Sequence, residues 1–390
     1  MAIKLLTLSP HGSFFFGSEV SFGQGQNQNY YVRSMLFPQQ TTVLGMLRFE
    51  LLKSDPEVFD PVTKKVRKKS KADAAIGESS FHEGREGGYG LLNCLSPVFL
   101  TNPKGVPYLL SAASRLEDSA RSSLEVDKQN GFVARNLLSG TENKQAILLK
   151  NDKGLPHDGK LEFAAELLGA DGTTLPLLYD GNEAPEGVFI LQNQIGNQKQ
   201  YDGETDESGF YKQDRYKLQT GWKFAVLADF NAELPMAFET SRHVQLGAER
   251  GMFLLETQTP KGKHFANISS DGNAFSGFET LYGQEYPKSK TLGGLALLSD
   301  CWLDSQLKPE PEFAMSKTVS FRHLNNTHLR DPNELWTANS APKSLRYNMF
   351  QRGSVFFSAN PSKHQDQIQS LESFRRIGYN YCITFEKNQK

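Results

Sequence analysis

Arginine, glutamine and threonine residues early in the chain are suited to bind an anion. Arg33 lies in an extended segment that runs into a proline, and we expect a helix to begin just beyond it at Gln39, Gln40, Thr41 and Thr42. The first free N–H groups of a helix point beyond its end and favour negative charge. The segment therefore predicts an anion site at a helix entrance.

Two later segments place arginine beside glycine, which allows close approach of the backbone to a ligand, while arginine offers a forked donor to phosphate. The candidate binding residues there are Arg242, His243, Gly247, Arg250, Gly251, Arg352 and Gly353. His243 lies beside Arg242 just before the glycines, where it could face a phosphate. The structural alternative for residues 244–253 is a β-bulge with a surface arginine.

Basic residues alternate with tyrosines in a predicted hairpin after residue 195. They are Lys199, Tyr211, Lys212, Arg215 and Tyr216. Such a hairpin suits single-stranded nucleic acid, because rings stack on bases and cations meet phosphates. The same alternation is also common on any exposed antiparallel strand.

Catalytic motifs are absent from the sequence. It has no phosphate loop, no H-E-x-x-H, no C-x-x-C and no G-x-S-x-G. One histidine, His11, follows the first predicted strand and could act as general acid or base in metal-free RNA cleavage. We otherwise expect no catalytic residues, no metal and no cofactor.

Composition restricts the class of protein. The 390 residues favour two domains, and a net charge of −1 excludes a wholly electrostatic nucleic-acid binder but not a local basic groove. Cys94, Cys301 and Cys382 are few and far apart, as in a reducing compartment. No stretch approaches the roughly 20 apolar residues of a membrane span. We therefore expect a cytoplasmic protein with no membrane contact.

The order of expected elements indicates an α+β fold. We expect a strand at residues 3–8, a helix at 41–52, two batches of further strands and a helix at 361–376. The predicted domains are 1–240 and 241–390. Residues 53–90 hold a run of basic residues, which predicts a mobile solvated loop with phosphate contact as the alternative. Residues 118–187 show little regular pattern and are interpreted as an insertion.

Several segments resemble the RAMP superfamily of CRISPR-associated proteins and, within it, the third subunit of the type III-B (Cmr) RNA-targeting complex. They are SPHGSFFFG, YYVRSMLFPQQTTVLGMLR, LLNCLSPVFL, IGNQ with SGFYK, GWKFAVLADF, VQLGAERGMF, LALLSDCWL, RGSVFF and RRIGYN, in the family's order. The resemblance implies two ferredoxin-like (RRM-like) domains with long insertions.

The same resemblance implies a non-catalytic subunit that holds the 5′ tag of the CRISPR RNA. Its implied protein partners are the large Palm-domain subunit and the backbone subunits. Target RNA is implied as an indirect partner only. The RNA contacts it implies are Arg33 with residues 39–42, the Arg250 segment and the Arg352 segment. Two alternatives stay open: a metal-independent CRISPR RNA-processing endoribonuclease of the same superfamily, and a scaffold that touches only protein.

Overall fold

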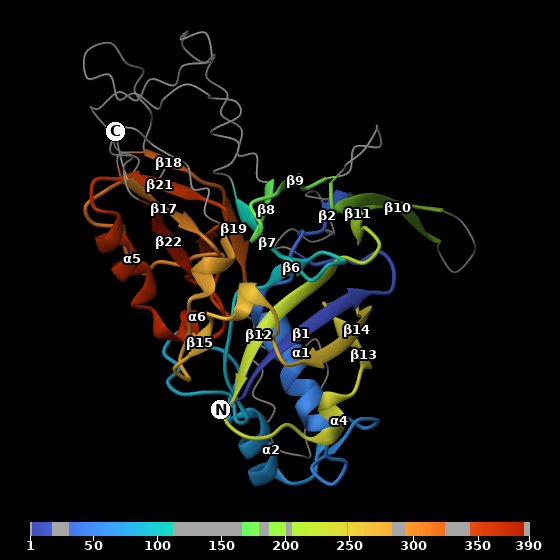
Figure 1. Cartoon of the computed structure of the whole chain (residues 1–390). Helices are drawn as coiled ribbons and strands as arrows, with labels where there is room; N and C mark the ends of the chain where they lie inside the picture. Colours follow the sequence, from blue (N-terminus) through green and yellow to red (C-terminus); the bar gives the residue numbers. More distant parts are fainter. Residues whose placement is uncertain are drawn as a thin grey trace.

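Strands predominate over helices in this protein. The computed structural model describes residues 2–17, 31–111, 166–178, 187–199, 205–247, 249–282, 293–311, 313–323 and 344–385. Short helices lie on and between sheets in this part of the chain (Figure 1). The predicted α+β class is confirmed, whereas the two ferredoxin-like domains stay a prediction.

The largest sheet has the order β13-β14-β1-β12-β6-β7-β8-β9, and β5 also pairs with β12. Its strands are β1 (Ala2–Pro10), β5 (Leu92–Leu95), β6 (Phe99–Thr101), β7 (Pro107–Ser111), β8 (Glu166–Gly169), β9 (Thr174–Pro176), β12 (Lys223–Phe230), β13 (Arg242–Leu246) and β14 (Gly251–Gln258). The apolar strand β1 is central, with β12 and β14 antiparallel on either side. The strand predicted at residues 3–8 is therefore confirmed.

One face of this sheet is covered by helix α1 (Gln40–Lys53). Val43, Leu44 and Leu47 recur at helical spacing and are buried in the same hydrophobic core as Leu6 and Leu8 of β1. The short helix α4 (Met236–Glu239) packs beside β14. The helix predicted at residues 41–52 is confirmed, and its burial fixes the position of its N-terminal residues.

A second sheet, of order β18-β21-β17-β22, lies on the other side of the large sheet. Its strands are β17 (Gly293–Leu297), β18 (Phe313–Met315), β21 (Val355–Ser358) and β22 (Cys382–Phe385), and helices α5 (Pro361–Gln369) and α6 (Glu372–Arg376) follow β21 in the chain. Leu5, Phe99 and Leu227 of the large sheet share one hydrophobic core with Val355 and Phe357. This core joins the two sheets.

Smaller elements fill the space around these sheets. They are the hairpins β15 (Ser269–Ser270) with β16 (Phe275–Ser276) and β19 (Thr318–Phe321) with β20 (Tyr347–Phe350), and the 3₁₀ helices η1 (Lys263–Phe265) and η2 (Phe278–Tyr282).

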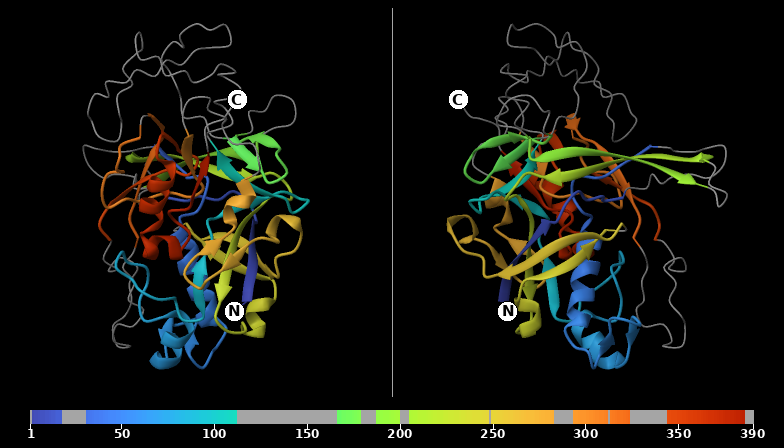
Figure 2. Two further views of the ribbon diagram at one scale, coloured as in Figure 1. Left: turned by 60° about the vertical axis from the view of Figure 1, so that its left-hand side comes forward. Right: turned by 90° about the vertical axis from the view of Figure 1, so that its right-hand side faces the viewer.

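A long hairpin of β10 (Phe189–Lys199) and β11 (Thr205–Leu218) extends away from the body (Figure 2, right). The short strand β2 (Tyr31–Arg33) lies parallel to β11 and completes a three-stranded sheet. The predicted hairpin is thus confirmed. Its pairing with β2 brings together residues that are about 180 positions apart in the sequence.

The segment 53–90 differs from the predicted mobile loop. It forms a small hairpin, β3 (Phe59–Asp60) with β4 (Lys65–Val66), and helix α2 (Lys69–Ile76), which packs on α1. Ala72 and Ile76 are buried and hold α2 in place. Three of the six cations in the basic run are paired locally: Arg67 with Asp60, Lys68 with Glu57 and Lys69 with Asp73, at 2.8–3.0 Å. These three cations have partners within the protein, whereas Lys64, Lys65 and Lys71 are exposed, so the phosphate-contact alternative stays a prediction.

Two further expectations concern the organisation of the chain. Of the predicted insertion 118–187, the structure describes residues 166–178 and 187, where β8 and β9 join the large sheet. The hairpin β13–β14 follows the predicted boundary at residue 240 but pairs with β1, so the boundary stays a prediction. No described helix has the length and hydrophobicity to cross a membrane.

Candidate nucleic-acid interface

Tyr31, Arg33, Lys212 and Asp214 form a cation–aromatic cluster on one face of the sheet β10-β11-β2. The parallel pairing of β2 with β11 places Tyr31 beside Lys212 and Arg33 beside Asp214. Lys212 Nζ lies 5.3 Å from the centre of the Tyr31 ring, and the Arg33 guanidinium carbon lies 5.8 Å from it. Tyr31 keeps 42% of its residue surface exposed. Two cations therefore flank one accessible aromatic ring.

The buried Asp214 carboxylate holds the Tyr31 and Arg33 side chains of this cluster in place by hydrogen bonds. Its side chain is only 2% exposed, and it accepts hydrogen bonds from the Tyr31 hydroxyl and, at 3.2 Å, from Arg33 Nε. Partial burial and the hydrogen bond to Asp214 raise the pKa of Tyr31. The hydrogen bond with Tyr31 is the main cause that raises the pKa of Arg33, whose side chain stays 61% exposed. The guanidinium is thus held in place, charged and open to solvent.

The projecting hairpin extends this face. Ile195 pairs with Lys212, so Ile195, Lys212 and Tyr31 form a row across the three strands. Ile195 is 64% exposed. On the opposite face, Tyr211 lies over Gly196, where a Cβ would collide with its ring. The row offers an apolar group, a cation and an aromatic ring to a ligand that lies across the hairpin.

Other residues of the predicted hairpin motif serve the protein itself. Arg215 donates to the Ser13 carbonyl and to the Gln213 side chain, both at 3.2 Å, and Tyr216 is buried. The side chain of Lys199 lies outside the described residues. Among the motif residues whose side chains the structure describes, Lys212 is the one that joins the cation–aromatic cluster.

The entrance of α1 is closed by the C-terminal part of the chain. Gln40 is fully buried and donates to the carbonyls of Ser96 and Ile377, both at 2.8 Å. Gln39 accepts a 2.6 Å hydrogen bond from the Tyr379 hydroxyl. Because these amides tie distant segments together inside the protein, we leave Gln39 and Gln40 out of the interface proposed below. Thr41 and Thr42, which follow them, are half-buried.

Arg242 and His243 point to opposite faces of the large sheet, as alternation along a strand requires. Arg242 is half-buried on the α1 side, with its guanidinium carbon 4.7 Å from the centre of the Phe238 ring. His243 is exposed on the other side, and its ring centre lies 4.7 Å from that of His11. His243 is in β13 and His11 directly follows β1, and because β14 lies between β13 and β1 the two rings meet across it. Sequence analysis did not predict this contact.

The turn between β13 and β14 exposes Arg250. Gly247 has a φ of +85°, and a Cβ there would lie 3.1 Å from the Phe15 carbonyl oxygen, so glycine is required. Arg250 donates its N–H to the Gly247 carbonyl at 3.1 Å, and its side chain is exposed. Gly251 then begins β14 opposite Leu246. The segment is a tight turn with a surface arginine, and the pairing of β13 with β14 has no register shift, so the β-bulge of the structural alternative does not form there.

Arg352 is enclosed in the protein rather than presented to a ligand. Its guanidinium donates to the Val98 carbonyl at 2.9 Å and meets the Asp300 carboxylate at 3.4 Å. The Phe37 ring centre lies 4.7 Å away, and only 3% of Arg352 is exposed. Gly353, with a φ of +82°, donates its N–H to Leu297. We interpret both residues as structural and leave them out of the proposed interface.

The part of the chain that the structure describes contains neither a cluster of metal ligands nor an exposed thiol. No three histidine, cysteine, aspartate or glutamate side chains gather there where a metal ion could bind. Cys94, Cys301 and Cys382 are buried free thiols, and burial raises the pKa of each.

Comparison with known proteins decides the family. The family model described as CRISPR-associated protein (Cas_Cmr3) matches residues 6–143 and 177–274, more than half of the chain. The chain belongs to the Cmr3 family. No curated protein matches it.

Three solved structures are similar to this Cmr3-family protein. The cryo-EM structure of type III-B Cmr-beta bound to cognate target RNA is 12% identical, covering 97% of this chain and 96% of that chain at a TM-score of 0.45. The structure of Cmr-beta bound to cognate target RNA and AMPPnP is 13% identical, covering 98% of this chain and 96% of that chain at a TM-score of 0.46. The structure of the apo state of Cmr-beta is 13% identical, covering 66% of this chain and 97% of that chain at a TM-score of 0.28.

The ranges of the Cmr3 match contain both candidate surfaces of the protein. Residues 6–143 include β2, and residues 177–274 include the hairpins β10–β11 and β13–β14. Sequence analysis missed Tyr31 and Asp214. The alternation in Tyr31-Val-Arg33 and Lys212-Gln-Asp214 indicates shared faces, but nothing in the sequence pairs the two segments.

Proposed function

We propose that the chain is a non-catalytic RNA-binding subunit of a type III-B CRISPR effector complex. It holds the 5′ tag of the CRISPR RNA and joins the large Palm-domain subunit to the backbone subunits. Membership of the Cmr3 family supports the assembly. The observation that carries the RNA-binding role is the exposed Tyr31 ring between Arg33 and Lys212.

The cation–aromatic cluster suits single-stranded RNA. An unpaired base can stack on Tyr31, and stacking of this kind contributes about 1–3 kcal/mol per base. Lys212 lies beside Tyr31 on the neighbouring strand and Arg33 lies two residues along β2, and we propose that they contact phosphates of the same RNA strand. Because Asp214 already holds Tyr31 and Arg33 in place, less side-chain entropy is lost when RNA binds.

A second contact is supplied by the turn and face of β13–β14. Arg250 and His243 are exposed there, and neither is in an ion pair within the described residues. Both side chains can donate to phosphate oxygens. We therefore propose that the RNA contacts two surfaces: mainly the cation–aromatic cluster, and in addition the surface of β13–β14.

The metal-independent endoribonuclease is the second candidate function, and one observation favours it: His11 is exposed and in contact with His243. Two catalytic imidazoles must lie on either side of a phosphate to act as base and acid. With ring centres 4.7 Å apart, these two are in contact with each other. The pair therefore suits binding better than a two-histidine cleavage step.

RNA crosslinking tests the proposal. Guide RNA carrying 4-thiouridine within its 5′ tag is assembled with the complex, irradiated, and the attached peptides are identified by mass spectrometry. We expect crosslinks to peptides containing Tyr31 or Lys212. Crosslinks from the tag to other subunits alone would contradict the proposal and support the protein-only scaffold.

Incubation of the chain with CRISPR repeat RNA in EDTA tests the second candidate. We expect no specific cleavage. Specific products that disappear in His11→Ala would establish the endoribonuclease instead.

A further inference from the structure

Strand β10 forms the outer edge of the three-stranded sheet β10-β11-β2. It has 11 residues, against roughly five to six in an average strand, and it projects from the body with β11 (Figure 2, right). The outer strands of the two larger described sheets, β9, β13, β18 and β22, have three to five residues. Among these sheets, β10 therefore presents the longest edge.

Alternate residues of β10 direct their backbone groups away from β11. Leu191 pairs with Tyr216, whose N–H and carbonyl are bonded to Phe14 on the side away from β10. In an antiparallel pair, two residues opposite each other either exchange both hydrogen bonds or both point outward. The backbone groups of Leu191 therefore point to the free side of β10. Phe189, two residues earlier, points the same way and donates its N–H to the Leu177 carbonyl at 2.8 Å.

The same geometry holds further along the strand. Asn193 pairs with Asp214, whose carbonyl accepts from the Ser34 N–H at 2.9 Å on the side away from β10. Asn193 therefore also points outward, and alternation extends the pattern to Ile195. Leu191, Asn193 and Ile195 thus present a row of N–H and C=O groups that matches the backbone of one further strand.

This edge lacks the features that usually prevent strand addition. Natural edge strands are very short or carry charged residues, proline or bulges. Residues 189–198 contain neither a charged residue nor proline. The register shift of the hairpin lies beyond this stretch of edge, between Asn197 and Lys199. The row from Leu191 to Ile195 is therefore open to pairing.

The side chains along the edge determine what can pair with it. Leu191 is 39% exposed and Ile195 is 64% exposed, and both lie on one face because they are four residues apart. The three residues between them carry amides, and Gln192 donates to the Leu191 carbonyl at 3.2 Å, which leaves that oxygen a second lone pair. No cation is present here for RNA phosphates. An extended peptide with aliphatic residues opposite Leu191 and Ile195 matches both backbone and side chains.

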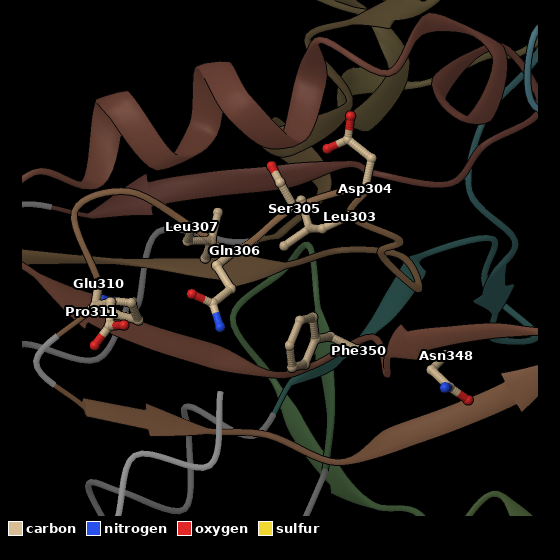
Figure 3. A pocket seen from close by; sticks show the side chains of 9 residues that line it. All are labelled: Leu303, Asp304, Ser305, Gln306, Leu307, Glu310, Pro311, Asn348 and Phe350. Atoms are coloured by element: carbon tan, nitrogen blue, oxygen red, sulfur yellow. The ribbon is translucent and has the colours of Figure 1, made fainter. Parts of the chain in front are cut away.

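The cavity beside β20 offers no comparable site. It has a volume of about 310 Å³ and is lined by residues of the segment 303–311 and by Asn348 and Phe350 (Figure 3). Asp304 and Glu310 lie at its opposite ends and point apart. Its polar groups therefore do not converge on one ligand, whereas those of the β10 edge lie in one row.

We propose that the free edge of β10 binds an extended, uncharged segment of a protein partner as a fourth strand of the sheet. Main-chain hydrogen bonds supply the affinity, and aliphatic pairs with Leu191 and Ile195 select the partner. The added strand lies on the side of β10 away from β11 and β2, which carry the cation–aromatic cluster. The inference does not rest on the proposed RNA contacts.

Amide hydrogen exchange of the full chain, followed by NMR, tests this proposal without RNA. The probe is the uncharged peptide acetyl-Thr-Val-Thr-Leu-Thr-Ile-Thr-amide. We expect it to slow exchange saturably at Leu191, Asn193 and Ile195, whereas the amides of Gln192 and Gln194, which face β11, are already slow. Methylation of the peptide nitrogens of its three aliphatic residues should abolish the effect, because these N–H groups face β10. Methylation at the threonines should leave it unchanged.

Two substitutions of one residue supply the matched control in the protein. Asn193→Pro removes an N–H at the free edge and no hydrogen bond to β11, whereas Asn193→Ala keeps that N–H. We expect the proline variant to bind the peptide about tenfold more weakly and the alanine variant to bind it like the wild type. Slow exchange at Gln192 and Gln194 in both variants would show that the hairpin is intact.

Four outcomes would overturn the proposal. Two concern the peptide: no saturable slowing of exchange at the edge, and equal effects of the two methylated peptides. The third is equal affinity of Asn193→Pro and Asn193→Ala for the unmethylated peptide. The fourth is slow exchange at Leu191, Asn193 and Ile195 in the chain alone, which would mean that another part of this chain or a second copy of it occupies the edge.

Discussion

Replacement of Arg352 by methionine separates a structural arginine from a binding one. The substitution keeps most of the aliphatic stem but removes the guanidinium from Asp300, which is 8% exposed at its side chain, and from the Val98 carbonyl. Removing one partner of a buried ion pair leaves the other charge uncompensated and costs about 3–5 kcal/mol. We therefore expect Arg352→Met to destabilise the fold strongly.

The size of this effect can be converted into a melting temperature. At about 2.1 cal/mol/K per residue, 390 residues that unfold together have an unfolding entropy of roughly 0.8 kcal/mol/K. A loss of about 3–5 kcal/mol then lowers Tm by about 4–6 °C. The matched control is Arg250→Ala, because Arg250 is exposed and should change stability by less than about 0.5 kcal/mol.

Differential scanning calorimetry of the two variants measures the shift, and RNA binding is measured well below Tm. Arg352→Met should lower Tm and keep its RNA affinity, whereas Arg250→Ala should leave Tm nearly unchanged and weaken RNA binding. If Arg352→Met leaves Tm unchanged within a degree and lowers RNA affinity tenfold, Arg352 belongs to the RNA interface and our interpretation is refuted.

Three further perturbations follow from the same contacts. Tyr31→Leu should weaken single-stranded RNA binding by about 1–3 kcal/mol in fluorescence anisotropy, with an unchanged salt dependence, because it removes stacking but no charge. Gly247→Ala should destabilise the protein by about 1 kcal/mol or more in urea denaturation, since its φ is +85° and the new Cβ meets Phe15; Gly12→Ala, with open space around it, is the control. Gln40→Leu should cost about 1–3 kcal/mol in the same assay, because it leaves two buried carbonyl groups unpaired.

Each of these expectations has a result that would contradict it. An unchanged affinity in Tyr31→Leu would exclude stacking on this ring. A Gly247→Ala variant as stable as Gly12→Ala would show that the turn can relax. An unaltered urea midpoint in Gln40→Leu would mean that the two hydrogen bonds of the buried Gln40 amide do not contribute to the stability of the fold.

Local features of this fold could be predicted from the sequence. The apolar run of β1, the helical spacing of Val43, Leu44 and Leu47, and the alternation along β10–β11 each depend on near neighbours in the chain. The turn at Arg250 was not predicted, because the sequence analysis allowed a β-bulge there, whereas Gly247 takes a positive φ and lets the chain reverse. Helix α2 was missed because it has few apolar residues: Ala72 and Ile76 alone are buried.

Long-range features could not be predicted in the same way. Tyr31 and Lys212 are far apart in the chain and meet only through the parallel pairing of β2 with β11. Arg352 stands beside a glycine, as a ligand-binding arginine often does. In the structure it is buried together with Asp300, and this ion pair gives it a structural role. Sequence alone does not say which arginines the fold encloses.

The most direct test of the central claim is a salt titration of RNA affinity in the Arg33→Ala/Lys212→Ala double variant. Lys217→Ala is the control, because Lys217 is exposed on the other face of β11. Fluorescence anisotropy with a labelled single-stranded guide RNA should show at least about tenfold weaker binding. The slope of log affinity against log salt should fall by about 1.4, the value for two phosphates of a single strand. Affinity and slope equal to those of the wild type and of Lys217→Ala would contradict the account.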